Sequence, residues 1–386
     1  MVSTDKGELS ALDLAPEVGT QCDNSTDDDE DGWVNEGCPR DGTKAERGRE
    51  CANSTNDDAV DDIPDDDKIN DGCPAAVPLW TFPTGQEEPE IDLEAIYTTP
   101  QVIGDTVYLA GYSGDVYALN LDDGSVLWSF NADGPIIAGL AASETAVYVA
   151  TDNGTLYALS LEDGSERQRF PAGGGIWGTP LLVEGVVYVA SVNGKLYALD
   201  AETLDPIWDA PFEAERGLIS DPVLADGAIL IGGFDRTLYA VDAETGEERV
   251  GWPFKAGNWF WGRPLVLDGT VYAPNLDGNL YALSLESGAP VWDAPCEALE
   301  PLRSAPLLAG DTLVIVDRKG NIYGLDPETG IRIWSKIEED GIEKTVLSNP
   351  IVDSPVLGEE VFISAQGGDL FRIDPETGSF VKVVTP

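Results

Sequence analysis

One strand-like sequence returns seven times along the chain, and it constrains the fold more than any other feature. Each copy places an aromatic residue in a stretch such as LYALD, and consecutive copies are mostly 40 to 42 positions apart. The aromatic positions are Tyr117, Tyr157, Tyr197, Tyr239, Tyr281, Tyr323 and Phe371. A repeat of this length is one supersecondary unit, which buries its apolar face only against its neighbours. The pattern therefore predicts a repeat architecture.

Each repeat has the pattern of four short β-strands. A proline-led apolar run and a glycine turn precede the aromatic strand, and an Asp-Gly or Thr-Gly turn leads to a last strand with tryptophan. This alternation, with its many Gly and Pro residues, excludes helical repeats. Sheets of this kind pack radially in β-propellers. We predict an all-β fold: a seven-bladed β-propeller of four-stranded antiparallel blades over residues 79–386, preceded by a small irregular disulfide- and calcium-containing segment over residues 1–78.

The segment PLWTFPTG around Trp80 repeats the last-strand signature without the three strands that should precede it. We expect this segment to add the outer strand to the blade that begins at Ser354. Such pairing would join the two ends of the ring and remove exposed strand edges.

A motif of the form Asp-x-x-Thr-Gly-x-x-x-Trp follows the aromatic strand, with its full version at Asp326, Thr329, Gly330 and Trp334. It resembles the tryptophan-docking motif of the quinoprotein-type, or pyrroloquinoline-quinone-repeat, propellers. Three copies depart from it, with Leu204 at the glycine position and Gln168 and Lys382 at the tryptophan position. We assign the motif residues to folding, because glycine suits a left-handed turn and tryptophan suits docking between blades.

The resemblance implies three kinds of behaviour. Quinoprotein-type propellers include quinone-dependent alcohol dehydrogenases, non-enzymatic scaffolds such as the outer-membrane-protein assembly lipoprotein, and extracellular binding propellers. The dehydrogenases carry an adjacent cysteine pair at the quinone and a calcium ion in the central funnel, and this sequence has no Cys-Cys pair. We therefore expect a non-enzymatic binding or structural propeller, with a pyrroloquinoline-quinone-dependent dehydrogenase as the alternative.

Composition narrows the chemistry and the partners further. With 71 acidic against 22 basic residues, the formal charge of −49 disfavours nucleic acid and anionic lipid surfaces as partners. Histidine is absent, which removes the commonest general base and most zinc sites. A glycosidase that uses only two carboxylates stays open, although 71 candidates identify no pair. No apolar run is long enough to span a membrane.

Four of the five cysteines lie in an acidic segment before the repeats, at Cys22, Cys38, Cys51 and Cys73. An even number of cysteines in a small region predicts a disulfide framework, and hence an extracellular, cell-surface or periplasmic location. We expect bridges from Cys22 to Cys38 and from Cys51 to Cys73. Cys296 takes the place of Phe212 in a matching octet, so we expect a buried free thiol there.

Oxygen-bearing side chains in this acidic segment have the spacing of a calcium loop. Asp27, Asp29 and Asp31 precede a glycine, Trp33 offers a backbone carbonyl, and Asn35 supplies a further oxygen. This unit resembles the disulfide-bracketed calcium repeats of thrombospondin type 3. A second unit offers further oxygens, and a merely solvated acidic run remains the alternative for both. The candidate ligands of the second unit are Asp61, Asp62, Asp65, Asp67 and Asn70.

A candidate binding face follows from one position in each repeat, three residues before the proline-led strand, which should enter the mouth of the central channel. In chain order the residues there are Tyr97, Ile137, Trp177, Ile219, Trp261, Arg303 and Val352. Large aromatics and an arginine at such a place suit a protein or glycan ligand. Tyr97, Trp177, Trp261 and Arg303 are therefore the candidate ligand-binding residues. Two alternatives stay open: these side chains plug the funnel, or the chain assembles with itself.

Overall fold

The computed structural model describes residues 2–3, 9–13, 77–83, 91, 93, 95–337, 351–352, 361–365 and 369–384. All regular secondary structure within those residues is β-strand. The strands form seven four-stranded antiparallel sheets, which we number as blades in chain order, and one three-stranded sheet near the N-terminus. The all-β prediction and its four-stranded repeat unit are confirmed.

Four strands in chain order build each blade. Blade 1 contains β4 (Gln101–Ile103), β5 (Thr106–Ala110), β6 (Asp115–Asn120) and β7 (Val126–Asn131). Blade 2 contains β8 (Ala141–Ala142), β9 (Ala146–Ala150), β10 (Thr155–Ser160) and β11 (Glu166–Pro171). Blade 3 contains β12 (Leu181–Val183), β13 (Val186–Ala190), β14 (Lys195–Asp200) and β15 (Phe212–Glu213).

The remaining blades follow the same order. Blade 4 contains β16 (Val223–Ala225), β17 (Ala228–Gly232), β18 (Thr237–Asp242) and β19 (Phe254–Lys255). Blade 5 contains β20 (Leu265–Leu267), β21 (Thr270–Pro274), β22 (Asn279–Ser284) and β23 (Cys296–Glu297). Blade 6 contains β24 (Leu307–Ala309), β25 (Thr312–Val316), β26 (Ile322–Leu325) and β27 (Arg332–Lys336). Blade 7 contains β28 (Ile351–Val352), β29 (Val361–Ala365), β30 (Asp369–Ile373) and β31 (Phe380–Val384).

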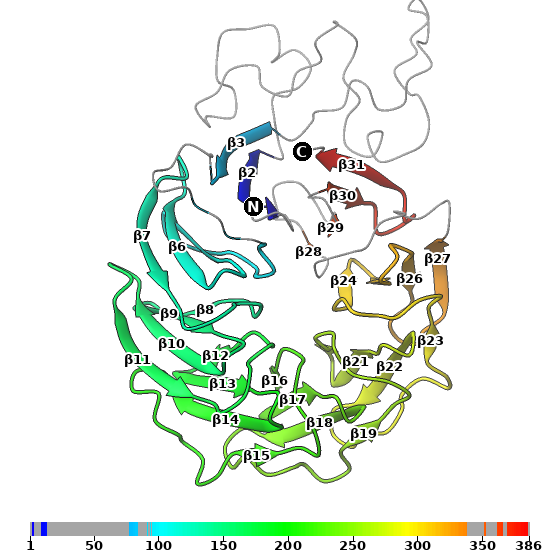
Figure 1. Cartoon of the computed structure of the whole chain (residues 1–386). Coiled ribbons are helices and arrows are strands. Elements are labelled where there is room, and N and C mark those ends of the chain that lie inside the picture. Colours follow the sequence, from blue (N-terminus) through cyan, green and yellow to red (C-terminus); the bar gives the residue numbers. More distant parts are fainter. Residues whose placement is uncertain are drawn as a thin grey trace, which may run out of the picture.

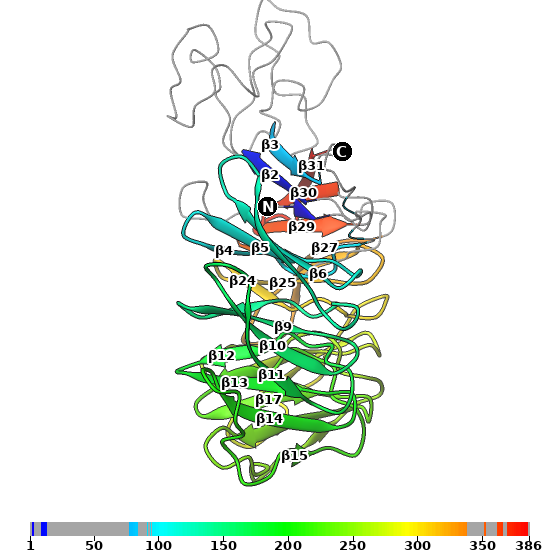
Figure 2. The same cartoon turned by 60° about the vertical axis from the view of Figure 1, so that its left-hand side comes forward.

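The three-stranded sheet joins the two ends of the ring. It consists of β1 (Val2–Ser3), β2 (Leu9–Asp13) and β3 (Val77–Phe82). Figure 1 shows the seven blades following one another around a common axis, with this sheet between blade 1 and blade 7. The oblique view of Figure 2 also places β2 and β3 beside β30 and β31.

The expected role of the Trp80 segment is wrong in one respect. β3 does not pair with the last blade; it pairs with β2, from Leu9 opposite Phe82 to Asp13 opposite Val77. Blade 7 has its own fourth strand, β31. β2 and β3 pair although residues 14–76 separate them in the sequence. The predicted disulfides and calcium ligands, from Cys22 to Cys73, lie outside the described residues.

The apolar core lies between the faces of neighbouring blades. One cluster of buried side chains, for example, combines Tyr108 and Val116 of blade 1 with Val147 and Leu159 of blade 2. A single blade could not bury both of its faces, so each junction stabilises the two blades that form it.

Tryptophans fasten most of these junctions, as the docking motif predicts. Each indole Nε1 donates to a backbone carbonyl in the turn between the third and fourth strands of the next sheet, at 2.7 to 3.2 Å. At five of the six turns, the indole is the nearest obstacle to a Cβ on the turn glycine, which itself has a positive φ. The glycine is therefore required both by its backbone conformation and by the close approach of the ring. The pairs are Trp80 and Leu121, Trp128 and Leu161, Trp208 and Ala243, Trp252 and Leu285, Trp292 and Pro327, and Trp334 and Pro375.

Two departures from the motif fall at the same junction, between blades 2 and 3. Gln168 stands where blade 2 would supply its tryptophan, and Leu204 stands where blade 3 would supply the glycine under it. Leu204 has a φ of 56° and is buried in a cluster with Tyr148. The Tyr148 hydroxyl donates to the carbonyl of Ala201 at 2.7 Å, which keeps a polar fastening across this junction. At this junction the Leu204 side chain packs in the cluster that contains Tyr148.

Candidate functional site

Two kinds of loop meet at one end of the blades. The connection that enters the first strand of a blade lies at the same end as the turn between its second and third strands, because the strands are antiparallel. The turn between the third and fourth strands lies at the opposite end. Side chains from the first two kinds of loop therefore gather around the channel opening, while the docking turns lie on the other face.

Five side chains at this end form what we call the mouth cluster: Trp177, Phe234, Trp259, Trp261 and Arg303. They come from blades 3 to 6. Trp177, Trp261 and Arg303 precede the first strands of blades 3, 5 and 6, as predicted, and Trp259 lies two residues before Trp261. Phe234 comes from the turn between β17 and β18 of blade 4.

The rings of the mouth cluster contact one another in a continuous series. Ring centroids are 4.7 Å apart for Trp259 and Phe234 and 5.6 Å apart for Phe234 and Trp177, both edge to face. Trp177 and Trp261 are 6.0 Å apart and tilted by 45°. The guanidinium carbon of Arg303 then lies 4.4 Å from the centroid of Trp261. Such distances suit aromatic packing and a cation–π contact.

Both ends of the cluster, Trp259 and Arg303, are exposed, and the rings between them are more covered. Trp259 is 40% exposed, whereas Trp177 and Trp261 are half-buried. Trp177 is also held by a hydrogen bond from its Nε1 to Oδ1 of Asp152 at 2.6 Å. The half-buried pair thus covers part of the opening, while Trp259 stays exposed.

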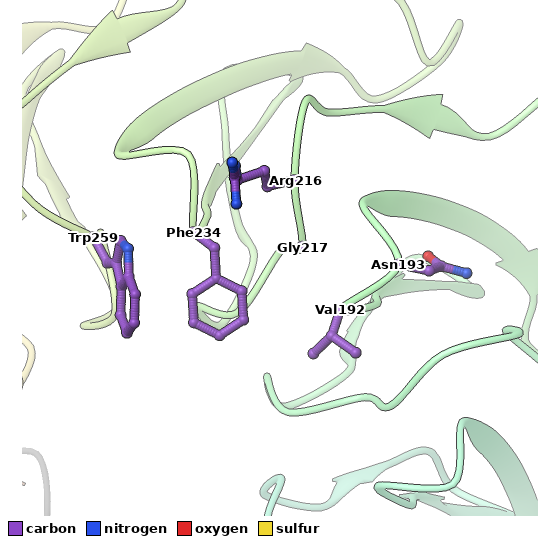
Figure 3. A pocket seen from close by; sticks show the side chains of 6 residues that line it. All are labelled: Val192, Asn193, Arg216, Gly217, Phe234 and Trp259. Atoms are coloured by element: carbon purple, nitrogen blue, oxygen red, sulfur yellow. The ribbon is translucent and has the colours of Figure 1, made fainter.

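A shallow pocket of about 490 Å³ borders the Trp259 end of the mouth cluster. Val192, Asn193, Arg216, Gly217, Phe234 and Trp259 line it. Figure 3 shows the rings of Phe234 and Trp259 side by side, projecting the same way, with Val192 on the far side of Gly217. The pocket therefore combines three apolar side chains, those of Val192, Phe234 and Trp259, with the polar groups of Asn193 and Arg216.

Tyr97 does not join the mouth cluster. It is 57% exposed, and its ring contact is with Tyr112, edge to face at 5.8 Å. Both tyrosines belong to blade 1, whereas the cluster uses blades 3 to 6. The four predicted residues are therefore divided into a group of three and a separate tyrosine pair.

The assignment of Val352 to the mouth was wrong. β28 begins at Ile351, directly after Pro350, and Val352 pairs with Val361 inside the sheet. The blade thus begins before Ser354, because Pro350 rather than Pro355 leads its first strand. The residue three positions before Pro350 is Leu347, which lies outside the described residues.

Residues from the second kind of loop were missed. Phe234 and Asp152 contact the predicted tryptophans, Tyr112 contacts Tyr97, and Arg318 lies near Arg303. Tyr112, Asp152 and Arg318 lie two residues before the repeating turn glycine, and Phe234 lies two residues before Arg236, which has a positive φ of 68° at the same place in its turn. At that place the residue type changes from blade to blade.

Buried carboxylates fix two of these turns. Asp235 accepts from the Thr237 amide at 3.0 Å and from the Tyr239 hydroxyl at 2.8 Å, next to Phe234. Asp317 accepts from the amides of Lys319 and Asn321 and from the Tyr323 hydroxyl, next to Arg318. Because these acceptors are buried and satisfied, they hold Phe234 and Arg318 in place.

A second set of hydrogen bonds ties the first strands together beside the channel. The Gly139 amide donates to Oγ1 of Thr179 at 3.0 Å, and the Thr179 amide donates to Oδ1 of Asp221 at 2.6 Å. Burial raises the pKa of Asp221, although the Thr179 hydrogen bonds and the charge of Arg263 oppose the rise. These bonds connect blades 2, 3 and 4 just below Trp177.

The arginines at this end lack acidic partners. Within the described part of the chain, the ion pairs use Arg169, Lys195, Arg249 and Lys319. None of them involves Arg303, Arg318 or Arg216. Burial lowers the pKa of Arg303, and the charge of Arg318 lowers it further. The two guanidiniums are thus close enough to repel each other.

Two other sequence predictions concern cysteine and metal. Cys296 is buried and free, and it pairs with Leu280 as Phe212 pairs with Leu196, which confirms the prediction for this residue. Burial raises the pKa of its thiol. Across the residues that the structure places, no three metal-binding side chains lie together. Those residues also contain no helix that is long and apolar enough to cross a membrane.

Comparisons with known proteins agree with this architecture. The family model described as outer membrane protein assembly factor BamB matches residues 112–216, 205–294 and 249–383. The chain belongs to this family. Together these matches cover residues 112–383, so the BamB model spans blades 2 to 6 entirely, nearly all of blade 7, and the third and fourth strands of blade 1. The chain is thus a propeller of quinoprotein-type repeats, as its docking motif predicted.

Solved structures show the same fold. The crystal structure of BamB from Moraxella catarrhalis superimposes with a TM-score of 0.62 at 21% identity, covering 74% of this chain and 84% of that one. The computationally designed Ika8 protein also gives a TM-score of 0.62, at 15% identity, with 72% and 82% of the two chains covered. No curated protein sequence matches the chain. At these identities the structural likeness establishes the fold.

Proposed function

We propose that this BamB-family chain is a non-enzymatic scaffold that binds a protein through the mouth cluster. The observation that carries the proposal is the series of four aromatic rings and a stacked arginine, gathered from four blades at one end of the ring. Aromatic and arginine side chains dominate the energetics of protein interfaces. Repeating residues serve folding in every blade, whereas the mouth positions differ between blades and can form one asymmetric site.

Location and partner class draw support from the family. The family is described as an outer membrane protein assembly factor. We infer a periplasmic or outer-membrane-associated place for this chain, with an extracellular one as the alternative. A glycan ligand and self-assembly remain outcomes of the tests below.

A quinone-dependent dehydrogenase is the less favoured alternative. By resemblance to the quinone-dependent dehydrogenases, such an enzyme would need an adjacent cysteine pair and a group of calcium ligands in the central funnel. No two of the five cysteines are adjacent in the sequence. The described residues around the channel also contain no group of three metal-binding side chains. The residues present therefore do not fit the quinone.

Site-specific photo-cross-linking tests the proposed binding face. A photoreactive amino acid at Trp259 should give a cross-linked adduct with a defined protein in the cells that produce the chain. The same amino acid at Val250, which is 95% exposed in the connection between β18 and β19 at the opposite end, should not. A third position, the exposed Leu127 on the outer strand β7, controls for edge contacts. Adducts from Leu127 or Val250 but none from Trp259 would show that the mouth is not the binding face.

We also propose that calcium stabilises the acidic segment between β2 and β3, on the spacing of Asp27, Asp29 and Asp31. Calcium at about 100 times its dissociation constant should add about 2.7 kcal/mol to the stability of the state that binds it. Calorimetric titration of the full chain should give heat of binding, which replacement of the three aspartates by asparagine should remove. Replacing the exposed Asp105, Asp122 and Glu162 matches the charge change and should leave the heat intact. Equal heats in both variants would overturn the calcium proposal.

A further inference from the structure

The stacking of Arg303 leaves its hydrogen-bonding groups free. The guanidinium carbon of Arg303 lies 4.4 Å from the centroid of the Trp261 ring, a cation–π contact that supplies no oxygen acceptor. The N–H donors of a guanidinium point outward in its plane, in a fork that matches the two oxygens of a carboxylate. No hydrogen bond from the Arg303 side chain to another described residue is formed. A positioned donor fork at the channel opening thus has no acceptor of its own.

A second arginine lies beside the first. Arg318 comes from the turn that Asp317 holds, and its charge contributes to the lowered pKa of Arg303. Arg216 lines the neighbouring pocket. In a chain with 71 acidic and 22 basic residues, three arginines without a described carboxylate partner at one end of the ring are unusual. A bound anion would relieve the repulsion between Arg303 and Arg318.

The rest of the site has a different chemistry and sets a direction. From Arg303 the ring series runs through Trp261, Trp177 and Phe234 to the exposed Trp259. Asp152, at the side of Trp177, makes that flank acidic. A ligand would therefore place its anionic group at the arginines and an apolar or aromatic side chain at Phe234 and Trp259.

We propose that the mouth cluster binds a protein segment in which a carboxylate, held by Arg303 and Arg318, neighbours an apolar or aromatic side chain, held by Phe234 and Trp259. This inference rests on the proposed function and names its ligand class. A neutral glycan would leave both arginines without a carboxylate. The net charge of −49 repels polyanions at a distance, so the segment carries one or two carboxylates rather than a long acidic run.

Paired synthetic peptides test the carboxylate. The probe is an acetylated and amidated peptide, Gly-Ser-Asp-Trp-Asp-Ser-Gly, and its isostere replaces both aspartates by asparagine. Calorimetric titration of the full chain should show the aspartate peptide binding at least about 10-fold more tightly, since a charge-assisted bidentate contact contributes more than a neutral one. A third peptide, the asparagine version with a free C-terminus, distinguishes a chain-end carboxylate from a side-chain one. A preference for either carboxylate source supports the inference.

Variants locate the effect. Arg303→Gln with Arg318→Gln should reduce the preference for aspartate to less than about twofold, while Arg303→Lys, which keeps the charge but loses the fork, should lose most of it. Arg167→Gln with Arg249→Gln removes the same charge near the opposite end of the blades and should leave the preference unchanged. Thermal melting of each variant confirms that it folds.

The outcomes separate this inference from the proposed function. Equal binding of all three peptides, with and without a carboxylate, would overturn the inference, while cross-linking from Trp259 would still support a mouth that binds protein. An unchanged preference in the Arg303 and Arg318 double variant would overturn it as well. Binding of neither peptide, or tighter binding of an oligouronate than of the aspartate peptide, would also contradict an acidic protein segment.

Discussion

Replacing Trp292 by alanine is expected to lower the free energy of unfolding by about 3–5 kcal/mol. The indole is buried between blades 5 and 6, packs at 5.6 Å from the ring of Tyr272, and donates to the Pro327 carbonyl at 3.1 Å. A Cβ added to Gly330 would lie 2.6 Å from the indole, which shows how closely the turn covers it. Alanine would therefore leave a cavity at a blade junction and remove one hydrogen bond. Chemical denaturation of the variant measures the loss.

Two further variants separate packing from hydrogen bonding and from surface effects. Trp292→Phe keeps an aromatic ring but loses the N–H donor, so it should cost about 1–2 kcal/mol, from the lost hydrogen bond and a smaller cavity. Trp259→Ala removes an indole that is 40% exposed in the mouth cluster and should cost less than about 1 kcal/mol. If Trp259→Ala were as destabilising as Trp292→Ala, the mouth rings would serve folding as the docking rings do.

Alkaline pH is expected to destabilise the propeller in a defined window. Burial, together with a hydrogen bond to an aspartate, raises the pKa of Tyr239, Tyr281 and Tyr323 to about 12 in each case. The pKa of tyrosine in an unfolded chain is about 10. Because the folded pKa is the higher one, the stability that these groups contribute is fully present below pH 10. It is lost as the pH rises from about 10 through about 12.

A shift from about 10 to about 12 corresponds to about 3 kcal/mol in full for each tyrosine, at about 1.4 kcal/mol per unit, and about 2 kcal/mol of it should be lost by pH 12. Denaturant unfolding at intervals of about half a pH unit, between about pH 9 and about pH 12, measures how the free energy of unfolding changes with pH. Tyrosinate absorbance is followed in parallel. Tyr239→Phe and Tyr281→Phe should each remove about a third of the change, at the cost of an aspartate left with one fewer donor. A free energy of unfolding that stays constant over this window would contradict the assignment.

The repeat itself could be predicted because its signals are local. The aromatic strand, the turn glycine and the docking tryptophan are each fixed by neighbours within one blade or the next, so their spacing identifies four strands per unit. Even the departures at Gln168 and Leu204 were visible in the sequence. What the sequence did not show is that these two residues meet at one junction, because that requires knowing which blade each tryptophan docks on.

The three-stranded sheet was missed for a different reason. Residues LSALD from Leu9 to Asp13 resemble the LYALD of other copies, but Ser10 takes the place of the tyrosine. The partner strand lies beyond residues 14–76, so the usual spacing between third and fourth strands is lost. A search that required only the apolar alternation, without the aromatic residue, would have found this copy.

Only part of the mouth was predicted, because only one of the two kinds of loop that form it was considered. The positions before the first strands gave Trp177, Trp261 and Arg303, whereas the turns that supply Phe234 and Arg318 were treated as turns alone. Val352 was misplaced because prolines at 350 and 355 both have the pattern of a strand leader, and only the pairing of Ile351 with Phe362 decides between them. Contacts across blades, such as that of Trp177 with Phe234, follow from ring geometry and not from spacing.

A crystal structure of the protein with the aspartate peptide bound is the most direct test of the mouth as the functional surface. The account predicts a peptide carboxylate in a bidentate contact with Arg303, close to Arg318, and the peptide tryptophan against Phe234 and Trp259. A peptide bound instead along the outer strands β7 or β27, with the mouth cluster untouched, would contradict it.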